Sequence, residues 1–472
     1  MSSQAQMAQG RPVLDPAKDE AALLDRCATL CNEAKKAGAE EAEAFASRRA
    51  TVAVRFEKGE LKLVQVDEGT SLGLRAFREH KLGFSSTNQE GDRSLTETAQ
   101  AALMLADVSP ADEHNRLPAA RPIPGRYDLV TPEVANLPVE TAVARATEFV
   151  ERVKAVDPKL SIDQVELEAS AGSHAIHAAP RGESIVRASE SDAVLSISVF
   201  GMAIDGEDVG GFHYNGDIAR NLPDFDKACD AAIEEFSEVA LGNLGSGHAE
   251  SYQGPVLFSP YALLSIFVSP LVSAASAIAV QRERSALAGK LGTGVASSML
   301  NVIDDPTDLT LAGCGTFDRE GQPTARFPLV EDGVLKSWLY NGYAASVDGV
   351  TSTGHAAGGA RSTPGLGTHA IVVPGAGEHD KAGLMRELGK GLFVQRFSGT
   401  VDPASGDFSG VAKSARWIED GKVVRPVRET LLSGNAFELL HRIALLSKDP
   451  ERCMGSSKAP FALIDGVSVT AG

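Results

Sequence analysis

The same order of helical and strand-like segments occurs twice in the first half of the chain, and this repeat limits the possible folds most. Residues 20–37 have apolar side chains every three to four positions, and they precede several strand-like segments and a second helical segment at 95–106. The same order returns with helical segments at 140–156 and 224–239. An apolar period of 3.6 residues predicts helices, and strand-like runs between turn residues predict a meander. The pattern therefore indicates two units of similar topology.

Turn residues separate the strand-like segments of each unit. Lys58-Gly59 and Asp67 to Gly69 look like hairpin turns in the first unit, and Asp205-Gly206 looks like one in the second. Glycine supplies the positive φ that such turns require. The expected strands are 41–45, 51–57, 61–68, 71–78 and 81–86, then 162–169, 174–179, 184–187, 193–204 and 207–214.

Beyond a Gly-rich break at 242–247, the chain becomes mostly strand-like. Glu331-Asp332-Gly333 and Glu419-Asp420-Gly421 are the centres of two clear hairpins, and helices are expected at 384–388 and 436–446. The predicted fold class is α+β: a duplicated helix–strand-meander–helix half, followed by a Gly-rich, barrel-like β domain with helices. The expected domains are 19–125, 126–245 and 246–472.

An uncharged run from Gly254 to Gln281 contains 18 mostly apolar residues at 263–280. That length is the lower limit for a membrane span. However, Pro270 and several serines interrupt the run, and no asymmetric basic loops flank it. A helix buried on all sides in the third domain is the better prediction.

Charge and cysteine usage exclude some classes of function. The net charge of −18 repels phosphate backbones, and no basic patch is visible, so we expect no direct nucleic-acid binding. Five scattered cysteines favour a reducing compartment. Cys27 and Cys31 lie four apart on a helix, which favours buried thiols over a metal pair. Residues 1–19 are polar and show no signal peptide, so we expect a cytoplasmic protein.

No strong catalytic motif stands in the sequence: neither His-Glu-x-x-His, nor Gly-x-Ser-x-Gly, nor a P-loop is present. His174 and His177 are three apart on an expected strand and should point to opposite faces. His355 and His369 lie in glycine-rich loops, and such loops often line binding sites.

Several short motifs follow one another along the chain. They are Glu57-Lys58-Gly59, Leu72-Gly73-Leu74-Arg75-Ala76-Phe77, Leu82-Gly83-Phe84-Ser85-Ser86-Thr87, Asp318-Arg319-Glu320-Gly321, Ser352-Thr353-Gly354-His355 and Ser433-Gly434-Asn435. In this order they resemble the TldD/PmbA family, also labelled modulator of DNA gyrase, from about residue 19 to the end. Collinear motifs are more specific than any one of them.

Zinc-bearing members of the family have a helix that reads Leu-Leu-His-Glu-x-x-x-His, and a distant Cys completes their site. The matching stretch here is Leu263-Leu264-Ser265-Ile266-Phe267-Val268-Ser269-Pro270. Ser265 and Pro270 stand where the two His ligands would be, and Ile266 stands in place of the Glu base. Isoleucine and proline side chains cannot ligate a metal. The resemblance thus implies the metal-free type of the family, called TldE or PmbA.

The resemblance further implies a heterodimer with a TldD-like, zinc-bearing subunit that cleaves unfolded peptides or peptide precursors. This chain would hold no metal, would not be catalytic by itself, and could form a homodimer when alone. His355 and Arg361 are candidates for the wall of the substrate groove. Two alternatives stay open: a metallopeptidase whose metal is held by His248, His355, His369 or Cys453, and a stand-alone peptide-binding scaffold.

Overall fold

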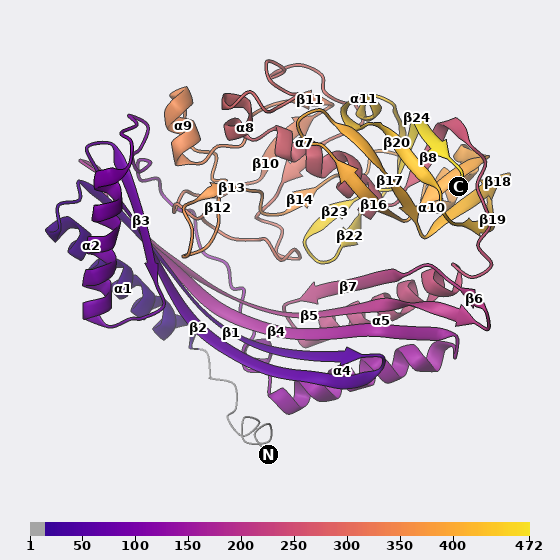
Figure 1. The fold of residues 1–472 in the computed structure, drawn as a ribbon, viewed down its shortest axis with the longest axis horizontal. Helices are drawn as coiled ribbons and strands as arrows, with labels where there is room; N and C mark the ends of the chain where they lie inside the picture. Colours follow the sequence, from indigo (N-terminus) through magenta and orange to yellow (C-terminus); the bar gives the residue numbers. More distant parts are fainter. Residues whose placement is uncertain (1–14) are drawn as a thin grey trace.

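A computed structural model describes residues 15–472 and shows mixed helices and strands, as the α+β prediction requires (Figure 1). The first half forms one long, curved sheet, a half-barrel, whose outer face is covered by helices. The C-terminal part lies on the concave side of this sheet. Part of the polar N-terminal stretch, in which the sequence shows no signal peptide, lies outside the described residues.

The half-barrel consists of two units that repeat one topology. The first contains α1 (Pro16–Lys36), β1 (Glu41–Glu57), β2 (Glu60–Arg78), β3 (Lys81–Thr87) and α2 (Asp92–Val108). After the short α3 (Pro132–Ala135), the second contains α4 (Val139–Val156), β4 (Leu160–Ala179), β5 (Val186–Asp205), β6 (Asp208–Val209), β7 (His213–Ala219) and α5 (Leu222–Leu241).

The two units meet where β1 pairs antiparallel with β4. The strand order is β3-β2-β1-β4-β5-β6, and β7 also pairs with β5, so each unit extends outward from the shared seam. One sheet thus spans both expected N-terminal domains, while the exact domain boundaries stay a prediction. The apolar faces of α1 and α2 cover the first unit, and those of α4 and α5 cover the second.

The strands are longer than the sequence suggested. Segments 41–45 and 51–57 belong to a single strand, and so do 61–68 and 71–78. The expected turn at Asp67 to Gly69 is therefore wrong: Asp67 pairs with Thr51, and Gly69 pairs with Arg49. Continuous pairing with β1 holds this stretch extended, although its composition suits a turn.

Two other turn predictions are confirmed. Lys58 and Gly59 have φ of 52° and 73° and connect β1 to β2. Gly206 has φ of 61° in the hairpin between β5 and β6. The chain direction reverses at these positions because the left-handed conformation matches the twist of the flanking strands.

The C-terminal part contains a nine-stranded sheet and a six-stranded sheet. The larger has the order β16-β17-β20-β24-β8-β15-β18-β19, with β21 paired to β24. Its strands are β8 (Tyr252–Phe258), β15 (Gly391–Val394), β16 (Arg396–Val401), β17 (Asp407–Lys413), β18 (Ala415–Glu419), β19 (Lys422–Val427), β20 (Leu431–Asn435), β21 (Ile443–Leu446) and β24 (Ala462–Thr470).

The smaller sheet has the order β11-β10-β9-β14-β23-β22. Its strands are β9 (Val302–Asp304), β10 (Phe327–Glu331), β11 (Val334–Leu335), β14 (Ile371–Val372), β22 (Glu451–Cys453) and β23 (Ser457–Ala459); a separate pair is β12 (Ala356–Ala357) and β13 (Gly365–Leu366). The helices of this part are α6 (Pro260–Leu263), the π-helical η1 (Leu264–Val268), α7 (Ser269–Ala274), α8 (Ala277–Gln281), α9 (Gly342–Asp348), α10 (Lys381–Leu388) and α11 (Ala436–Leu440).

Both expected hairpins are present, as β10–β11 and β18–β19. The helix expected at 436–446 is wrong in its second half, where Ile443 pairs with Ile464 of β24. Pairing with a neighbouring strand overrides the local helical pattern there. Within residues 15–472, no helix is long and apolar enough to cross a membrane.

Candidate functional site

The positions that the resemblance assigns to zinc chemistry lie on one helical stretch, α6–η1–α7. In η1, the backbone N–H of Ser269 donates to the carbonyl of Leu264, five residues back. Pro270 follows directly. Proline has no N–H to donate, and in a regular α-helix its ring crowds the carbonyl four residues back. The wider turn of η1 relieves this crowding, so Pro270 can lie inside the helical stretch. The single helix expected at 263–280 is thus interrupted by η1 and again between α7 and α8.

Two of the three positions are part of the hydrophobic core. Ile266 is 0% exposed and Pro270 is buried, whereas Ser265 is exposed. Ser269 and Ser273 continue the exposed row at intervals of four residues. The prediction of a helix buried on all sides is wrong along this serine row, and correct for the faces on either side of it.

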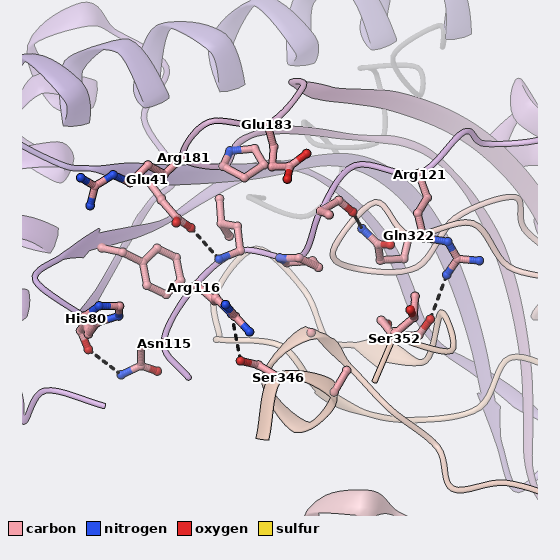
Figure 2. Close-up of a pocket in the computed structure, with 18 of the residues that line it drawn as sticks. Glu41, His80, Asn115, Arg116, Arg121, Arg181, Glu183, Gln322, Ser346 and Ser352 are labelled. Carbon is pink, nitrogen blue, oxygen red and sulfur yellow. Dashed lines mark hydrogen bonds between the residues drawn. The ribbon is translucent and has the colours of Figure 1, made fainter. Parts of the chain in front are cut away.

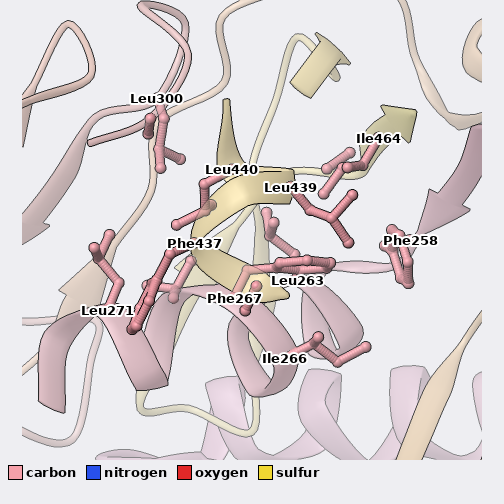
Figure 3. Packing of buried hydrophobic residues seen from close by; sticks show 14 of the residues in the cluster. Phe258, Leu263, Ile266, Phe267, Leu271, Leu300, Phe437, Leu439, Leu440 and Ile464 are labelled. Atoms are coloured by element: carbon pink, nitrogen blue, oxygen red, sulfur yellow. The ribbon is translucent and has the colours of Figure 1, made fainter. Parts of the chain in front are cut away.

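Aromatic and aliphatic side chains hold the stretch in place (Figure 3). The ring of Phe267 lies edge-to-face with Phe258 and with Phe408, at centroid distances of 5.1 and 5.9 Å. Ile266 and Leu271 belong to the same buried cluster. Such contacts fix the backbone at the three positions by packing and need no metal ion.

The side chains at these positions do not fit a zinc ion. The hydroxyl of Ser265 donates to the carbonyl of Ala262 at 3.3 Å, and the other two side chains have no donor atom. In the part of the chain that the structure describes, no three His, Cys, Asp or Glu side chains are grouped so as to hold a metal. No three of His248, His355, His369 and Cys453 therefore form a ligand set.

The thiols are buried. Cys27 and Cys31 donate to the carbonyls of Ala175 and His177, at 3.6 and 3.3 Å, on the apolar face of α1. Cys453 lies on β22, which packs against α6, and burial raises the pKa of its thiol to about 12. Burial also raises the pKa of the Cys27 and Cys31 thiols, so all three are protonated at neutral pH.

His355 is buried, and it lines neither of the two cavities described below. Its Nε2 lies 3.1 Å from Oδ2 of Asp304, and its Nδ1 lies 2.8 Å from Oγ1 of Thr353. Burial alone would raise the pKa of Asp304, and its contacts with His355 and His369 lower it below the ordinary value. The Nε2 of His369 lies 2.7 Å from the carbonyl of Gly354, so these groups hold the loops together.

Arg361 is exposed, and its Nε donates to Oγ of Ser71 on β2 at 3.1 Å. The loop that carries Arg361 therefore touches the half-barrel. Close packing supports this contact, since a Cβ at Gly73 of β2 would meet the carbonyl oxygen of Ala360 at 2.0 Å. The roles of His355 and Arg361 in a groove stay predictions.

A cleft of about 740 Å³ lies between the half-barrel and the segment around α9 (Figure 2). Three arginines line it. Arg116 donates to Oγ of Ser346 at 3.0 Å, and Arg121 donates to the carbonyl of Ser352 at 2.9 Å. The third, Arg181, lies on the opposite side. Ser352 lines this cleft, whereas the loop 353–367, which the sequence suggested as the groove wall, does not.

A second cavity, of about 350 Å³, is lined in part by residues 356–359 and 367–369 of the neighbouring loop segment. Its walls include His174 of the half-barrel, Asp318, His369 and the glycines Gly358 and Gly359. The ring of His174 stacks on Phe45 of the half-barrel and lies tilted against Phe317 of the C-terminal part, on the opposite face of β4 from the buried His177.

A buried ionic network joins the half-barrel to the C-terminal part, and one of its members, Arg319, also lines the second cavity. Arg319 donates to Oε1 of Glu43 at 2.8 Å, and Arg75 pairs with both Glu43 and Glu320. All four side chains are at most 7% exposed. In the sequence, Arg75 and Arg319 stand only as parts of the motifs that resemble the family. The available signal was a charge in the apolar run Leu74-Arg75-Ala76.

A further polar cluster next to α6 was not predicted from the sequence. The guanidinium of Arg396 lies between the rings of Tyr261 and Tyr214, at 3.4 and 4.2 Å from their centroids. Burial lowers the pKa of His213, whose Nε2 lies 3.8 Å from Glu235. Cation–π stacking links β7 of the half-barrel to the start of the serine-bearing helix.

Comparison with known proteins identifies this architecture. The profile of the PmbA/TldA metallopeptidase C-terminal domain matches residues 251–471, and that of PmbA/TldA metallopeptidase domain 1 matches residues 42–106. An uncharacterised protein of Methanocaldococcus jannaschii is 30% identical over 239 residues, which are 50% of this chain and 56% of that protein. The metalloprotease PmbA of Escherichia coli O157:H7 is 24% identical over 94% of this chain and 96% of its own length.

The fold has a close structural counterpart. The crystal structure of TldE from Thermococcus kodakarensis superposes with a TM-score of 0.85 at 21% identity, over 94% of this chain and all of that chain. Both family profiles and the full-length relative agree with the motifs in the sequence. The chain belongs to the PmbA/TldD family of metallopeptidases.

Proposed function

We propose that this chain is the metal-free, non-catalytic subunit of a two-subunit metallopeptidase, the TldE/PmbA type. The observation that carries the proposal is the burial of Ile266 and Pro270 in the core, at the positions where zinc-bearing relatives have a base and a ligand. A hydrolase of this class needs three protein ligands and an open position for water. Neither a ligand set nor a base is available on α6–η1–α7.

The partner is a TldD-like chain that keeps the histidines and the glutamate and holds zinc. Two chains of the same fold can pair around a pseudo-twofold axis, which leaves one competent site per pair. The substrate is an unfolded peptide or peptide precursor in the cytoplasm. This subunit's side of the groove comprises the cleft of Figure 2 and the adjoining loop 353–367, in which Arg361 is exposed and the buried His355 holds the loop in place.

Reconstitution from separately purified chains tests the proposal. We expect this chain to hold less than stoichiometric zinc, to cleave no peptide alone, and to restore cleavage when mixed with the zinc-bearing chain. Arg361→Ala should lower the activity of the pair without releasing zinc, and Arg93→Ala, on an exposed face of α2, is the matched control. A zinc-bearing chain that is fully active alone and never co-elutes with this one would favour the scaffold function. Chelator-sensitive cleavage by this chain alone would establish a different metal site.

A further inference from the structure

The cleft of Figure 2 carries two positive charges that form no ion pair in the described part of the chain. They belong to Arg116 and Arg121, which lie on the segment between α2 and α3. Their guanidinium groups donate to neutral acceptors instead, the hydroxyl of Ser346 and the carbonyl of Ser352. Such bonds orient a guanidinium group and leave its charge free to meet an anionic ligand.

The segment that carries the two arginines is fixed from both sides. On the half-barrel side, Oε2 of Glu41 accepts a hydrogen bond from the N–H of Leu117 at 2.6 Å. On the C-terminal side, Nε2 of Gln322 donates to the carbonyl of Ala119 at 3.2 Å. The guanidinium groups therefore start from an anchored backbone, and a ligand that binds them does not have to order the segment first.

The half-barrel side of the cleft is partly acidic, which limits the ligands that the cleft can take. Glu40 pairs there with Arg181 at 3.4 Å. Glu183 is exposed and forms no ion pair with any other described residue. Its charge and the net charge of −18 disfavour polyanions such as nucleic acids. A ligand with a single carboxylate suits the two arginines without bringing several negative charges against this wall.

We propose that Arg116 and Arg121 bind a carboxylate of the substrate peptide, either its C-terminal carboxylate or an acidic side chain. A guanidinium group matches a planar carboxylate, to which it can donate two parallel N–H bonds. The cleft volume of about 740 Å³ lies within the usual range of ligand pockets. This inference rests on the proposed function, because it takes the cleft to be this subunit's part of the groove. It adds the chemical group of the peptide that this subunit recognises.

Peptide binding to the full chain tests the proposal. The probes are peptides of alanine, glycine and serine with a neutral fluorophore at the N-terminus: a free C-terminal acid, the amide, and an amide with one internal glutamate. In fluorescence anisotropy at low salt, at least one carboxylate peptide should bind about fivefold tighter than the plain amide, because hydrogen bonds between charged groups are the stronger ones. The tighter of the two carboxylate peptides identifies the source of the carboxylate. Equal binding of all three peptides, or binding of none, overturns the proposal.

Arginine variants test which residues are responsible. Arg116→Ala and Arg121→Ala should each remove most of the preference for the carboxylate and leave binding of the amide unchanged. Both side chains are exposed, so the variants should fold normally, which circular dichroism checks. Arg116→Lys keeps the charge but loses the planar fork and should retain part of the preference. The matched control is Arg428→Ala, an exposed arginine outside the cleft. A preference that survives in the double alanine variant, or that is lost in the control, contradicts the assignment.

The cleavage assay of the reconstituted pair separates this inference from the proposed function. If the pair cleaves peptides but this chain binds the acids and the amide equally, the carboxylate site is wrong and the subunit function stands. If the arginine variants lose the preference for the carboxylate but the chain never forms an active pair, the carboxylate site stands as part of a peptide-binding scaffold.

Discussion

The buried ionic network makes a sharp prediction about how the half-barrel and the C-terminal part depend on each other. Glu43 is 0% exposed on β1 and accepts hydrogen bonds from Arg75 and from Arg319. The substitution Glu43→Gln removes the negative charge between two buried guanidinium groups and leaves them to share Glu320. Removing one partner of a buried pair costs about 3–5 kcal/mol, because the remaining charge is uncompensated.

The expected shift in melting temperature follows from the size of the chain. The entropy of unfolding is about 2.1 cal/mol/K per residue, which is about 1 kcal/mol/K for a chain of this length. Glu43→Gln should therefore lower the melting temperature by about 3–5 °C in calorimetry, if the chain unfolds as one unit. If the network joins the two parts, limited proteolysis should also cut the variant between them sooner.

An exposed ion pair is the matched control. Arg93 and Glu97 pair on the surface of α2, with 92% and 59% of their side chains exposed. Glu97→Gln should leave the melting temperature unchanged, because solvent screens such pairs. A drop below about 1 °C for Glu43→Gln, or equal drops for both variants, would refute the argument that the buried charges hold the two parts together.

Three further predictions follow from burial. Burial raises the pKa of Glu190 to about 7, so the folded state binds this proton more tightly than the unfolded state. The free energy of unfolding should therefore fall by about 3 kcal/mol as the pH rises from about 4.5 to 7, and Glu190→Gln should flatten that fall in melts at different pH. Phe267→Asp should abolish soluble expression, whereas Ser269→Asp on the exposed row should not, as blots of soluble fractions will tell. Native protein should react with a thiol reagent at none of its five cysteines until it is unfolded, since all five are buried.

Local patterns in the sequence predicted the elements whose cause is local. The four half-barrel helices follow from a 3.6-residue apolar period, and the turns at Lys58-Gly59 and Asp205-Gly206 follow from glycine's access to positive φ. The motifs also indicated the family. Alignment with the zinc-bearing helix of its members then showed that Ser265, Ile266 and Pro270 replace the two histidines and the glutamate. The helices and turns depend on residues within a few positions of each other, whereas the family resemblance depends on the order of short motifs along the chain.

Only the tertiary structure decided features that depend on distant partners. Strand β2 runs straight through Asp67 because β1 holds it, and residues 443–446 form a strand because β24 lies beside them. Likewise Glu43 and Arg319, 276 positions apart, become an ion pair only when the half-barrel meets the C-terminal part. Backbone hydrogen bonds and buried charges must find partners, and a sequence pattern does not say which distant residue supplies them.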